Sequence, residues 1–243
     1  ELTEYIPGPD MGTNEACMAW IKDEIDRAVG LPRALGGIPL DEIGATGFGL
    51  AVAAEVATAE AGLSLKGARV AIQGFGAVGQ HAARFLVQRG ARVVAASDSR
   101  GATCNRDGLD VDALIAHKRA GRGVSAFPTG SPMKSEDVIA VECEIWIPAA
   151  RPDTLTADNV GRLRARLVLQ GANIPATDSA EEAMHTRGIL SLPDFVVNAG
   201  GVICAAAEYH GGTQAQAFAA IEEKIRANTG EVLERSRTHH LRP

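Results

Sequence analysis

Three glycines are closely spaced in the segment Gly74-Phe75-Gly76-Ala77-Val78-Gly79. The segment follows a short apolar run and precedes a stretch with helical periodicity, which is the context of a loop that binds phosphate groups through its backbone. In such a loop the first glycine permits a tight turn, the second lets the backbone approach a pyrophosphate, and the third lets helix and strand pack closely. The helix adds unpaired N–H groups and the positive end of its dipole. The alternative is a glycine-rich turn that only joins a strand to a helix.

An acidic residue, Asp98, favours the phosphate-binding interpretation. It ends the second predicted strand, about 20 residues after the loop, where a carboxylate accepts hydrogen bonds from the hydroxyls of an adenosine ribose. These features predict a dinucleotide cofactor, NAD or NADP, with Ser99 and Arg100 beside Asp98 at the adenosine end. The charge of Asp98 favours NAD because it repels the 2′-phosphate of NADP, whereas Arg100 could pair with that phosphate or lie in solvent. We favour NAD and keep both cofactors open.

A parallel sheet is needed to position these groups. Short apolar runs alternate with helical stretches, the pattern of parallel strands joined by crossover helices. This pattern predicts an α/β fold, a doubly wound, mostly parallel Rossmann sheet with flanking helices. The predicted strands are 69–73, 91–97, 144–147, 167–169 and 195–197. The predicted helices are one that is capped by Thr13 or Asn14 and ends at Gly30, followed by 45–61, 78–88, 110–120, 158–164, 178–187 and 213–236.

The overall composition is that of an ordinary soluble globular protein. A chain of 243 residues with 46% apolar residues can form one large α/β domain with a sizeable core. The formal charge of −6 is spread along the chain, without a Lys/Arg block, so neither nucleic acid nor a membrane surface is an expected partner. No apolar run approaches the roughly 18 residues that a membrane helix needs, and we expect no signal peptide.

The four cysteines, Cys17, Cys104, Cys143 and Cys204, form no C-x-x-C pair of the kind that binds zinc or does redox chemistry. We expect reduced thiols in a cytoplasmic protein, and no metal site. Because the sequence opens at Glu1, without a methionine, in a segment rich in Pro and Gly, we also expect a trimmed or processed start.

Six segments of the chain can be compared, in their order and spacing, with known protein families. They are 9–13 (PDMGT), 45–47 (ATG), the glycine loop, 147–150 (IPAA), 171–173 (GAN) and 198–202 (NAGGV). Together they resemble the glutamate/leucine/phenylalanine/valine dehydrogenase family over essentially the whole chain. The resemblance implies the C-terminal NAD(P)-binding domain of an amino-acid dehydrogenase, which converts an L-amino acid, NAD(P)⁺ and water into a 2-oxo acid, ammonia and NAD(P)H. It also implies a parent enzyme that is a homo-oligomer, usually a hexamer.

By this resemblance Asp10 is the catalytic aspartate, which exchanges protons with the substrate amine and the attacking water. Oxidative deamination needs such a group, because the iminium left by hydride transfer must be hydrated and must then lose ammonia through several proton transfers. From its Pro-Asp-Met-Gly loop alone, Asp10 would be a turn residue. Thr46 matches a contact on the nicotinamide side, and its other possible role is to cap the helix that follows.

Asn173 and Asn198 each follow a predicted strand, at the edge where open α/β sheets bind ligands. By the resemblance, their amides orient the ribose or the nicotinamide, although Asn198 on its own could be a plain turn residue before two glycines. Ala149 and Ala150 are expected to line the cofactor cleft, because small side chains let the cofactor approach.

The sequence departs from the family at the substrate. Glutamate-specific members have a serine shortly after the Asn-Ala-Gly-Gly run, which helps to hold the side-chain carboxylate of the substrate. The matching residue here is Ala205, or Cys204 if the alignment is shifted by one. A methyl group cannot donate that hydrogen bond, so glutamate is favoured only by the resemblance and a less polar amino acid is conceivable. The family's substrate-binding lysines lie in a domain upstream of the Asp10 segment, so we expect these residues by themselves to bind cofactor with little or no turnover.

We divide the chain into three parts. Residues 1–35 are a remnant helix of the substrate domain and the hinge, 36–212 are the NAD(P)-binding Rossmann domain, and 213–243 are a C-terminal helix that returns toward the hinge. Two other functions compete with the enzyme. A catalytically inactive, stand-alone nucleotide-binding or regulatory module would make Asp10 an ordinary loop residue. Another Rossmann dehydrogenase, such as a hydroxy-acid enzyme, would need a catalytic histidine, and none is obvious. Three histidines lie in predicted helices outside the motifs and are given no catalytic role: His81, His117 and His185.

Overall fold

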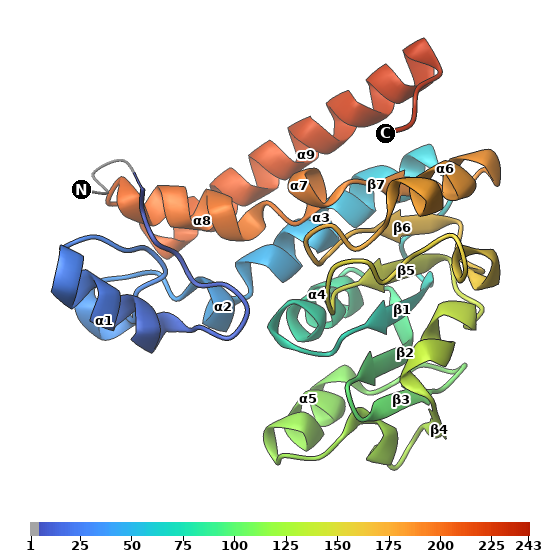
Figure 1. Cartoon of the computed structure of the whole chain (residues 1–243), viewed down its shortest axis with the longest axis horizontal. Coiled ribbons are helices and arrows are strands. Elements are labelled where there is room, and N and C mark those ends of the chain that lie inside the picture. The colour runs from blue at the N-terminus through green and yellow to red at the C-terminus, as the bar shows by residue number, and fades with distance from the viewer. Residues whose placement is uncertain (1–4) are drawn as a thin grey trace.

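The centre of the molecule is a seven-stranded sheet (Figure 1). Its strands are β1 (Arg69–Gln73), β2 (Arg92–Asp98), β3 (Gly101–Cys104), β4 (Ser131–Met133), β5 (Ile145–Pro148), β6 (Leu167–Leu169) and β7 (Leu190–Leu192). In the computed structural model, which describes residues 5–243, they lie in the order β4-β3-β2-β1-β5-β6-β7. Strands β2, β1, β5, β6 and β7 are parallel, and β3 and β4 extend one edge in the antiparallel direction. The predicted doubly wound, mostly parallel α/β fold is confirmed.

Helices cover both faces of the sheet. The α-helices are α1 (Glu15–Ile25), α2 (Leu40–Ile43), α3 (Ala45–Glu60), α4 (Ala77–Gln88), α5 (Val111–Arg119), α6 (Asp178–Thr186), α7 (Asp194–Val197), α8 (Gly200–Tyr209) and α9 (Gln214–His239). Short 3₁₀ helices are η1 (Arg33–Leu35), η2 (Val124–Ala126), η3 (Ser135–Ala140) and η4 (Val160–Arg162). One hydrophobic core joins the sheet to α3, α4, α5, α8 and α9. A second core joins the opposite face to α6, η3 and η4.

Alternation of side chains along the strands explains these two cores. Val70 and Ile72 of β1 belong to the first core, whereas Ala71 between them belongs to the second. In β5, Ile147 belongs to the first core and its neighbour Trp146 to the second, and both are fully buried. Successive residues of a strand point to opposite faces, and strands covered on both sides are apolar throughout. The apolar runs of β1 and β5 are therefore central strands.

Most predicted elements are present, but the predicted strand 195–197 is wrong. These residues form the end of α7, and the strand at this edge is β7, which pairs in parallel with β6. Asp194 in the first turn of α7 suits a helix start after Pro193. The side chain of Phe195 is 75% exposed, so the apolar Phe-Val-Val run is not a buried strand.

Other boundaries also differ from the prediction. The first helix ends at Ile25 rather than Gly30, because Asp26 adopts a left-handed conformation with φ of 58° and donates its N–H to the Lys22 carbonyl. Residues 158–164 contain only the short η4. Strands β3 and β4 and helix α8 were not predicted. The final helix begins after Thr213, as expected, with a reciprocal capping box between Thr213 and Gln216.

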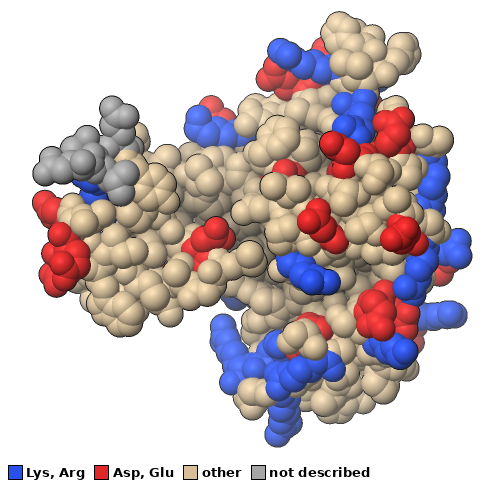
Figure 2. All heavy atoms as spheres, in the orientation of Figure 1, with Lys and Arg blue, Asp and Glu red and all other residues tan. Residues whose placement is uncertain are grey.

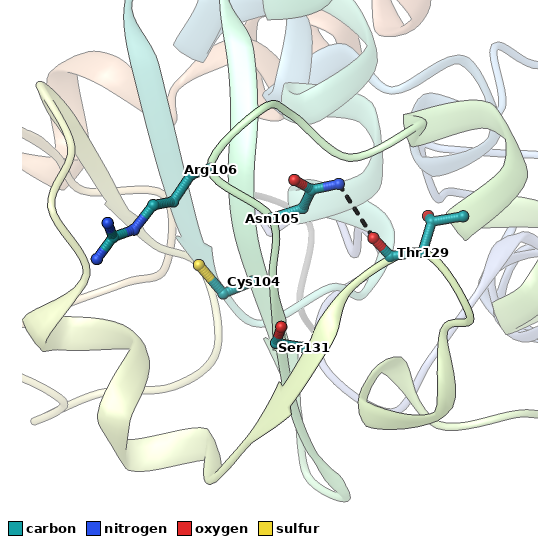
Figure 3. Close-up of a pocket in the computed structure, with 5 residues that line it drawn as sticks. All are labelled: Cys104, Asn105, Arg106, Thr129 and Ser131. Carbon is teal, nitrogen blue, oxygen red and sulfur yellow. Dashed lines mark hydrogen bonds between the residues drawn. The ribbon is translucent and has the colours of Figure 1, made fainter.

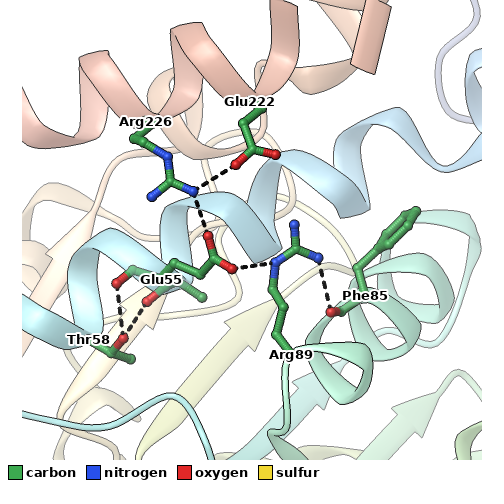
Figure 4. Close-up of polar contacts among 7 residues, drawn as sticks. Glu55, Thr58, Phe85, Arg89, Glu222 and Arg226 are labelled. Atoms are coloured by element: carbon green, nitrogen blue, oxygen red, sulfur yellow. Dashed lines mark hydrogen bonds and ion pairs between the residues drawn. The ribbon is translucent and has the colours of Figure 1, made fainter. Parts of the chain in front are cut away.

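A polar contact joins three of the helices that cover the first face (Figure 4). The carboxylate of Glu55 in α3 accepts hydrogen bonds from Arg89, just after α4, at 2.9 Å and from Arg226 in α9 at 2.6 Å. Arg226 also bonds to Glu222, four residues earlier in α9. Glu55 therefore ties α9, which is distant in sequence, to the pair α3 and α4.

Among residues 5–243, no helix is both long enough and apolar enough to cross a membrane.

We predict that Glu55→Ala lowers the free energy of unfolding by about 1–2 kcal/mol, because it leaves two guanidinium groups without their shared partner. The matched change Glu222→Ala removes only a partly exposed pair within one helix and is expected to cost about 0.5 kcal/mol or less. Urea unfolding of both variants measures the difference. Equal losses would contradict a bridging role for Glu55.

Candidate functional site at the carboxyl edge of the sheet

The three glycines of the loop have different surroundings. Gly74 has φ of +95°, and a Cβ there would lie 2.7 Å from backbone atoms of Ala149 and Ala150. A Cβ on Gly79 would lie 2.0 Å from the carbonyl oxygen of Gly74, so α4 packs directly on the end of β1. A Cβ on Gly76 would meet no heavy atom within 4 Å in the described structure. Gly74 and Gly79 thus make room for the protein's own backbone, and Gly76 leaves open space in front of the loop.

Hydrogen bonds fix the loop against its neighbours. The amides of Gly74 and Phe75 both donate to the Ser97 carbonyl, at 3.1 and 2.7 Å. The Gln80 side chain, which the sequence did not indicate, donates to the Phe75 carbonyl at 2.9 Å. Helix α4 begins after Gly76, and no side chain in the described chain caps it. The first N–H groups of α4, including those of Ala77 and Val78, are therefore available to an anion.

Asp98 lies at the end of β2 with its side chain only 8% exposed. Its carboxylate accepts hydrogen bonds from Lys118 Nζ at 2.5 Å, from the Arg100 amide at 2.8 Å and from the Val124 amide at 3.1 Å. Burial alone would raise the pKa of Asp98, but these bonds, led by that of Lys118, outweigh it and lower the pKa. Asp98 is therefore held as an anion. Lys118 was missed because it is 20 residues away, in the last turn of α5.

The adenosine side of the predicted cleft is positively charged. Lys and Arg side chains gather near α5, at the lower left of the view in Figure 2. The last turn of α5 carries Lys118 and Arg119, while Ser99 and Arg100 are exposed. Arg100 donates from its guanidinium to the Gly121 carbonyl at 2.8 Å. The carboxylate of Asp98 thus lies in a cationic environment.

Asn173 and Asn198 meet on the other side of the glycine loop. The Asn198 side-chain amide donates to Asn173 Oδ1 at 2.9 Å. Asn198 follows α7 rather than a strand, because the predicted strand before it is a helix. Next to them, the amide of Ala149 donates to the Gln73 carbonyl at 2.7 Å, which places Ala149 and Ala150 beside the end of β1. The predicted residues after β1, β5 and β6 therefore share one edge.

Thr46 lies where two helices start side by side. A Cβ on Gly200 would lie 2.2 Å from the Ala45 carbonyl oxygen, and one on Gly201 would lie 2.9 Å from Thr46 Oγ1. The N-cap of α3 is Gly44, which has no side-chain cap among the described residues. Thr46 is therefore not the helix cap, and its half-buried hydroxyl faces the start of α8.

Asp10 lies in an exposed turn, in which its amide and carbonyl bond to the Thr13 hydroxyl. The pKa of Asp41 in α2 is raised by burial first and then by the charges of Glu15 and Asp10. Helix α8 holds the N-terminal segment, because the carboxylate of its Glu208 accepts hydrogen bonds from the amide of Gly30 at 2.8 Å and from that of Leu31 at 3.1 Å.

The two candidates for the substrate-side position differ in burial. Cys204 is fully buried in the core, and burial raises the pKa of its thiol to about 12. Ala205, the next residue of α8, is half-buried. Of the two, only Ala205 has exposed surface that a substrate could touch.

A hollow on another part of the surface contains none of the residues of the glycine-loop edge. A cavity of about 350 Å³ is lined by Cys104, Asn105, Arg106, Thr129 and Ser131 (Figure 3). It lies at the β3–β4 edge, and Cys104 pairs with Ala95 in the middle of β2 rather than with its carboxyl end. Burial raises the pKa of the Cys104 thiol.

In residues 5–243 no three His, Cys, Asp or Glu side chains form a possible metal site, and all four cysteines are free. The candidate functional site is therefore the edge with the glycine loop.

Known proteins resemble this chain in sequence and in fold. The family model described as glutamate/leucine/phenylalanine/valine dehydrogenase matches residues 36–241, most of the chain. The chain belongs to this family. The glutamate dehydrogenase of Aeropyrum pernix is 36% identical over 247 aligned positions, which cover 96% of this chain and 59% of that protein.

Solved structures of the family have the same fold. The crystal structure of the hetero-hexameric glutamate dehydrogenase from Thermus thermophilus in its Leu-bound form superposes with a TM-score of 0.86 and 29% identity, over 97% of this chain and 59% of that one. Glutamate dehydrogenase from Peptoniphilus asaccharolyticus gives a TM-score of 0.76 and 26% identity, over 98% and 60%. The chain thus spans about three fifths of the length of these family members.

The ion pair at Asp98 predicts a pH-dependent stability. Because the pKa of Asp98 is lowered, its stabilising contribution is present above the ordinary aspartate pKa of 3.8 and is lost as the pH falls through the lower folded-state pKa. We expect Lys118→Met to lower the free energy of unfolding by about 2 kcal/mol at pH 7, with the loss shrinking below pH ~4. Urea unfolding at several pH values measures this. Exposed Arg119 provides the control, Arg119→Met, and a loss in Lys118→Met that does not depend on pH would refute the ion-pair account.

Proposed function

We propose that this chain is the NAD(P)-binding part of an amino-acid dehydrogenase that oxidatively deaminates an L-amino acid to a 2-oxo acid and ammonia. The observation that carries the proposal is the set of residues that meet at one edge of the sheet. There the chain brings together the open glycine loop, the anionic Asp98 and the Asn173–Asn198 pair. Membership of the dehydrogenase family supports the same reaction.

The residues at this edge suit a dinucleotide. Gly76 leaves space for a pyrophosphate, and the uncapped start of α4 supplies N–H groups and a positive dipole for it. Asp98 accepts from the adenosine ribose, with Ser99 and Arg100 beside it. Ala149 and Ala150 line the cleft, and Thr46, Asn173 and Asn198 orient the nicotinamide end. When bound, NAD(P)⁺ supplies the hydride acceptor for the reaction.

The proton transfers are assigned to Asp10. One of its carboxylate oxygens accepts the Met11 amide at 2.8 Å, which fixes the side chain at the exposed surface of its turn. From there a carboxylate can take a proton from the substrate ammonium group, release it to solvent, and later take a proton from the attacking water. Asp10 lies on the N-terminal segment, which Glu208 holds against α8. Helix α8 in turn begins at the cofactor edge.

The choice of substrate depends on Ala205. Glutamate is favoured by the relatives, which include glutamate dehydrogenases. Ala205 has no group that can bond to a side-chain carboxylate, and this feature supports a less polar amino acid as the second candidate.

The choice of cofactor depends on opposing charges. Asp98 favours NAD, because its carboxylate repels a 2′-phosphate, and we propose NAD as the preferred cofactor. Lys118 reduces that repulsion because it neutralises the carboxylate. Calorimetric titration with NADH and with NADPH decides between them.

The reaction is proposed for the enzyme at the full length of its family, with residues 1–35 as part of the substrate side and hinge, 36–212 as the cofactor domain and 213–243 as the returning helix. We propose an oligomeric enzyme, since a structural relative is described as hetero-hexameric. A nucleotide-binding module without chemistry is the second candidate.

Two glycine variants separate binding from folding. Gly76→Val places a side chain in open space in front of the loop, so it should keep the melting temperature and abolish calorimetric binding of NADH and NADPH. Gly79→Ala drives a Cβ into the Gly74 carbonyl and should instead destabilise the fold by about 1–3 kcal/mol. Unchanged binding by folded Gly76→Val, or no binding by the unaltered chain, would refute the cofactor site.

Asp10→Asn separates the enzyme from the module. At the family's full length, the enzyme should lose roughly 10²–10⁴-fold in kcat, while nucleotide affinity stays the same. Reduction of NAD(P)⁺ with a set of L-amino acids, followed at the absorbance of NAD(P)H, measures both the loss and the substrate. Thr13→Val, which changes the same turn but keeps the carboxylate, is the control. Full activity in Asp10→Asn would exclude the proposed role.

A further inference from the structure

Four residues, two of which are the asparagines of the amide pair, form a closed ring at the cofactor edge. The side chains of Asn198 and Asn173 bond to each other at 2.9 Å. Ile174, the residue after Asn173, donates its amide to Asp194 Oδ2 at 2.7 Å. The carbonyl of Asp194 in turn accepts the amide of Asn198 at 2.8 Å. Asp194 therefore holds both asparagine segments, one through its side chain and the other through its backbone.

Ile174 adopts a conformation that its residue type disfavours. Its φ is +46°, in the left-handed region, which is an outlier for a β-branched residue. Pro175 follows and makes an extended conformation the preferred alternative. The side chain of Ile174 is 66% exposed, so burial of its apolar surface does not offset the strain.

Two backbone contacts hold this strained residue. Its amide bonds to the Asp194 carboxylate, and its carbonyl accepts the amide of Asp153 at 3.0 Å. Only the first of these involves a charge, and hydrogen bonds to charged groups are the stronger kind. Without Asp194, the Ile174 backbone would relax toward the extended form and turn Asn173 away from Asn198.

We propose that Asp194 is a positioning residue for the cofactor: it holds Ile174 in the left-handed conformation and so keeps the two asparagine amides paired toward the nicotinamide end. This inference rests on the proposed function, in which Asn173 and Asn198 contact the dinucleotide. Asp194 itself acts through the ring and is not assigned a contact with cofactor or substrate.

The test uses glycine rescue in the full chain, measured by calorimetry with NADH. Asp194→Ala is expected to weaken NADH binding about tenfold or more, the effect of losing a hydrogen bond to a charged group. Adding Ile174→Gly should restore most of the affinity, because glycine adopts positive φ without the strain. Adding Ile174→Val, which keeps the β-branched side chain, should restore none. Loss of the charged bond should also speed exchange of the Ile174 amide proton in Asp194→Ala.

Thermal melting distinguishes positioning from simple stabilisation. Ile174→Gly enlarges the conformational entropy of the unfolded chain, so affinity should recover without a matching rise in melting temperature. Wild-type affinity in Asp194→Ala, or equal affinities in the glycine and valine double variants, would overturn the positioning role. If Asn173→Ala weakens binding and Asp194→Ala does not, only this inference fails. If the unaltered chain binds neither NADH nor NADPH, the proposed function fails and this inference fails with it.

Discussion

The carboxyl edge of the sheet is assembled by backbone contacts that only glycine permits. Gly79 brings α4 against the carbonyl of Gly74, and Gly200 brings α8 against the carbonyl of Ala45 in α3. Gly47 does the same between α3 and α4, where a Cβ would lie 2.5 Å from a backbone nitrogen. A side chain at any of these positions would separate the elements. The starts of α3, α4 and α8 therefore converge where the strands β1, β5 and β6 end, and the candidate site depends on that convergence.

Helix α8 extends this arrangement to the N-terminal segment. It begins just after Asn198, at the cofactor edge, and near its end Glu208 accepts the amides of Gly30 and Leu31. Gly30 lies against Pro9, the residue before Asp10, so closely that a Cβ would come within 2.6 Å of the proline ring. One helix thus connects the proposed nicotinamide contacts to the proposed proton-transfer residue. A change in the angle of α8 would move these two groups relative to each other.

The sequence predicted what depends on local pattern. The glycine loop, Asp98 and the strands around them follow from spacing and from the pattern of apolar residues, and in the structure the loop lies between β1 and α4 with Asp98 at the end of β2. The sequence did not predict Lys118, Glu208 or Asp194 as partners, because each bonds to residues that are distant in sequence. The strand error at 195–197 has the same origin. The place beside β6 is taken by β7, and the run 195–197 follows Pro193 and Asp194, which start a helix.

The central claim is that this edge binds a dinucleotide in a defined orientation. A crystal structure of the chain with NADH tests it most directly. The account predicts the pyrophosphate in front of Gly76 at the start of α4, the adenosine ribose at Asp98, and the nicotinamide carboxamide near Asn173 and Asn198. A nucleotide bound in the opposite orientation, or at another surface such as the hollow around Cys104, would contradict it.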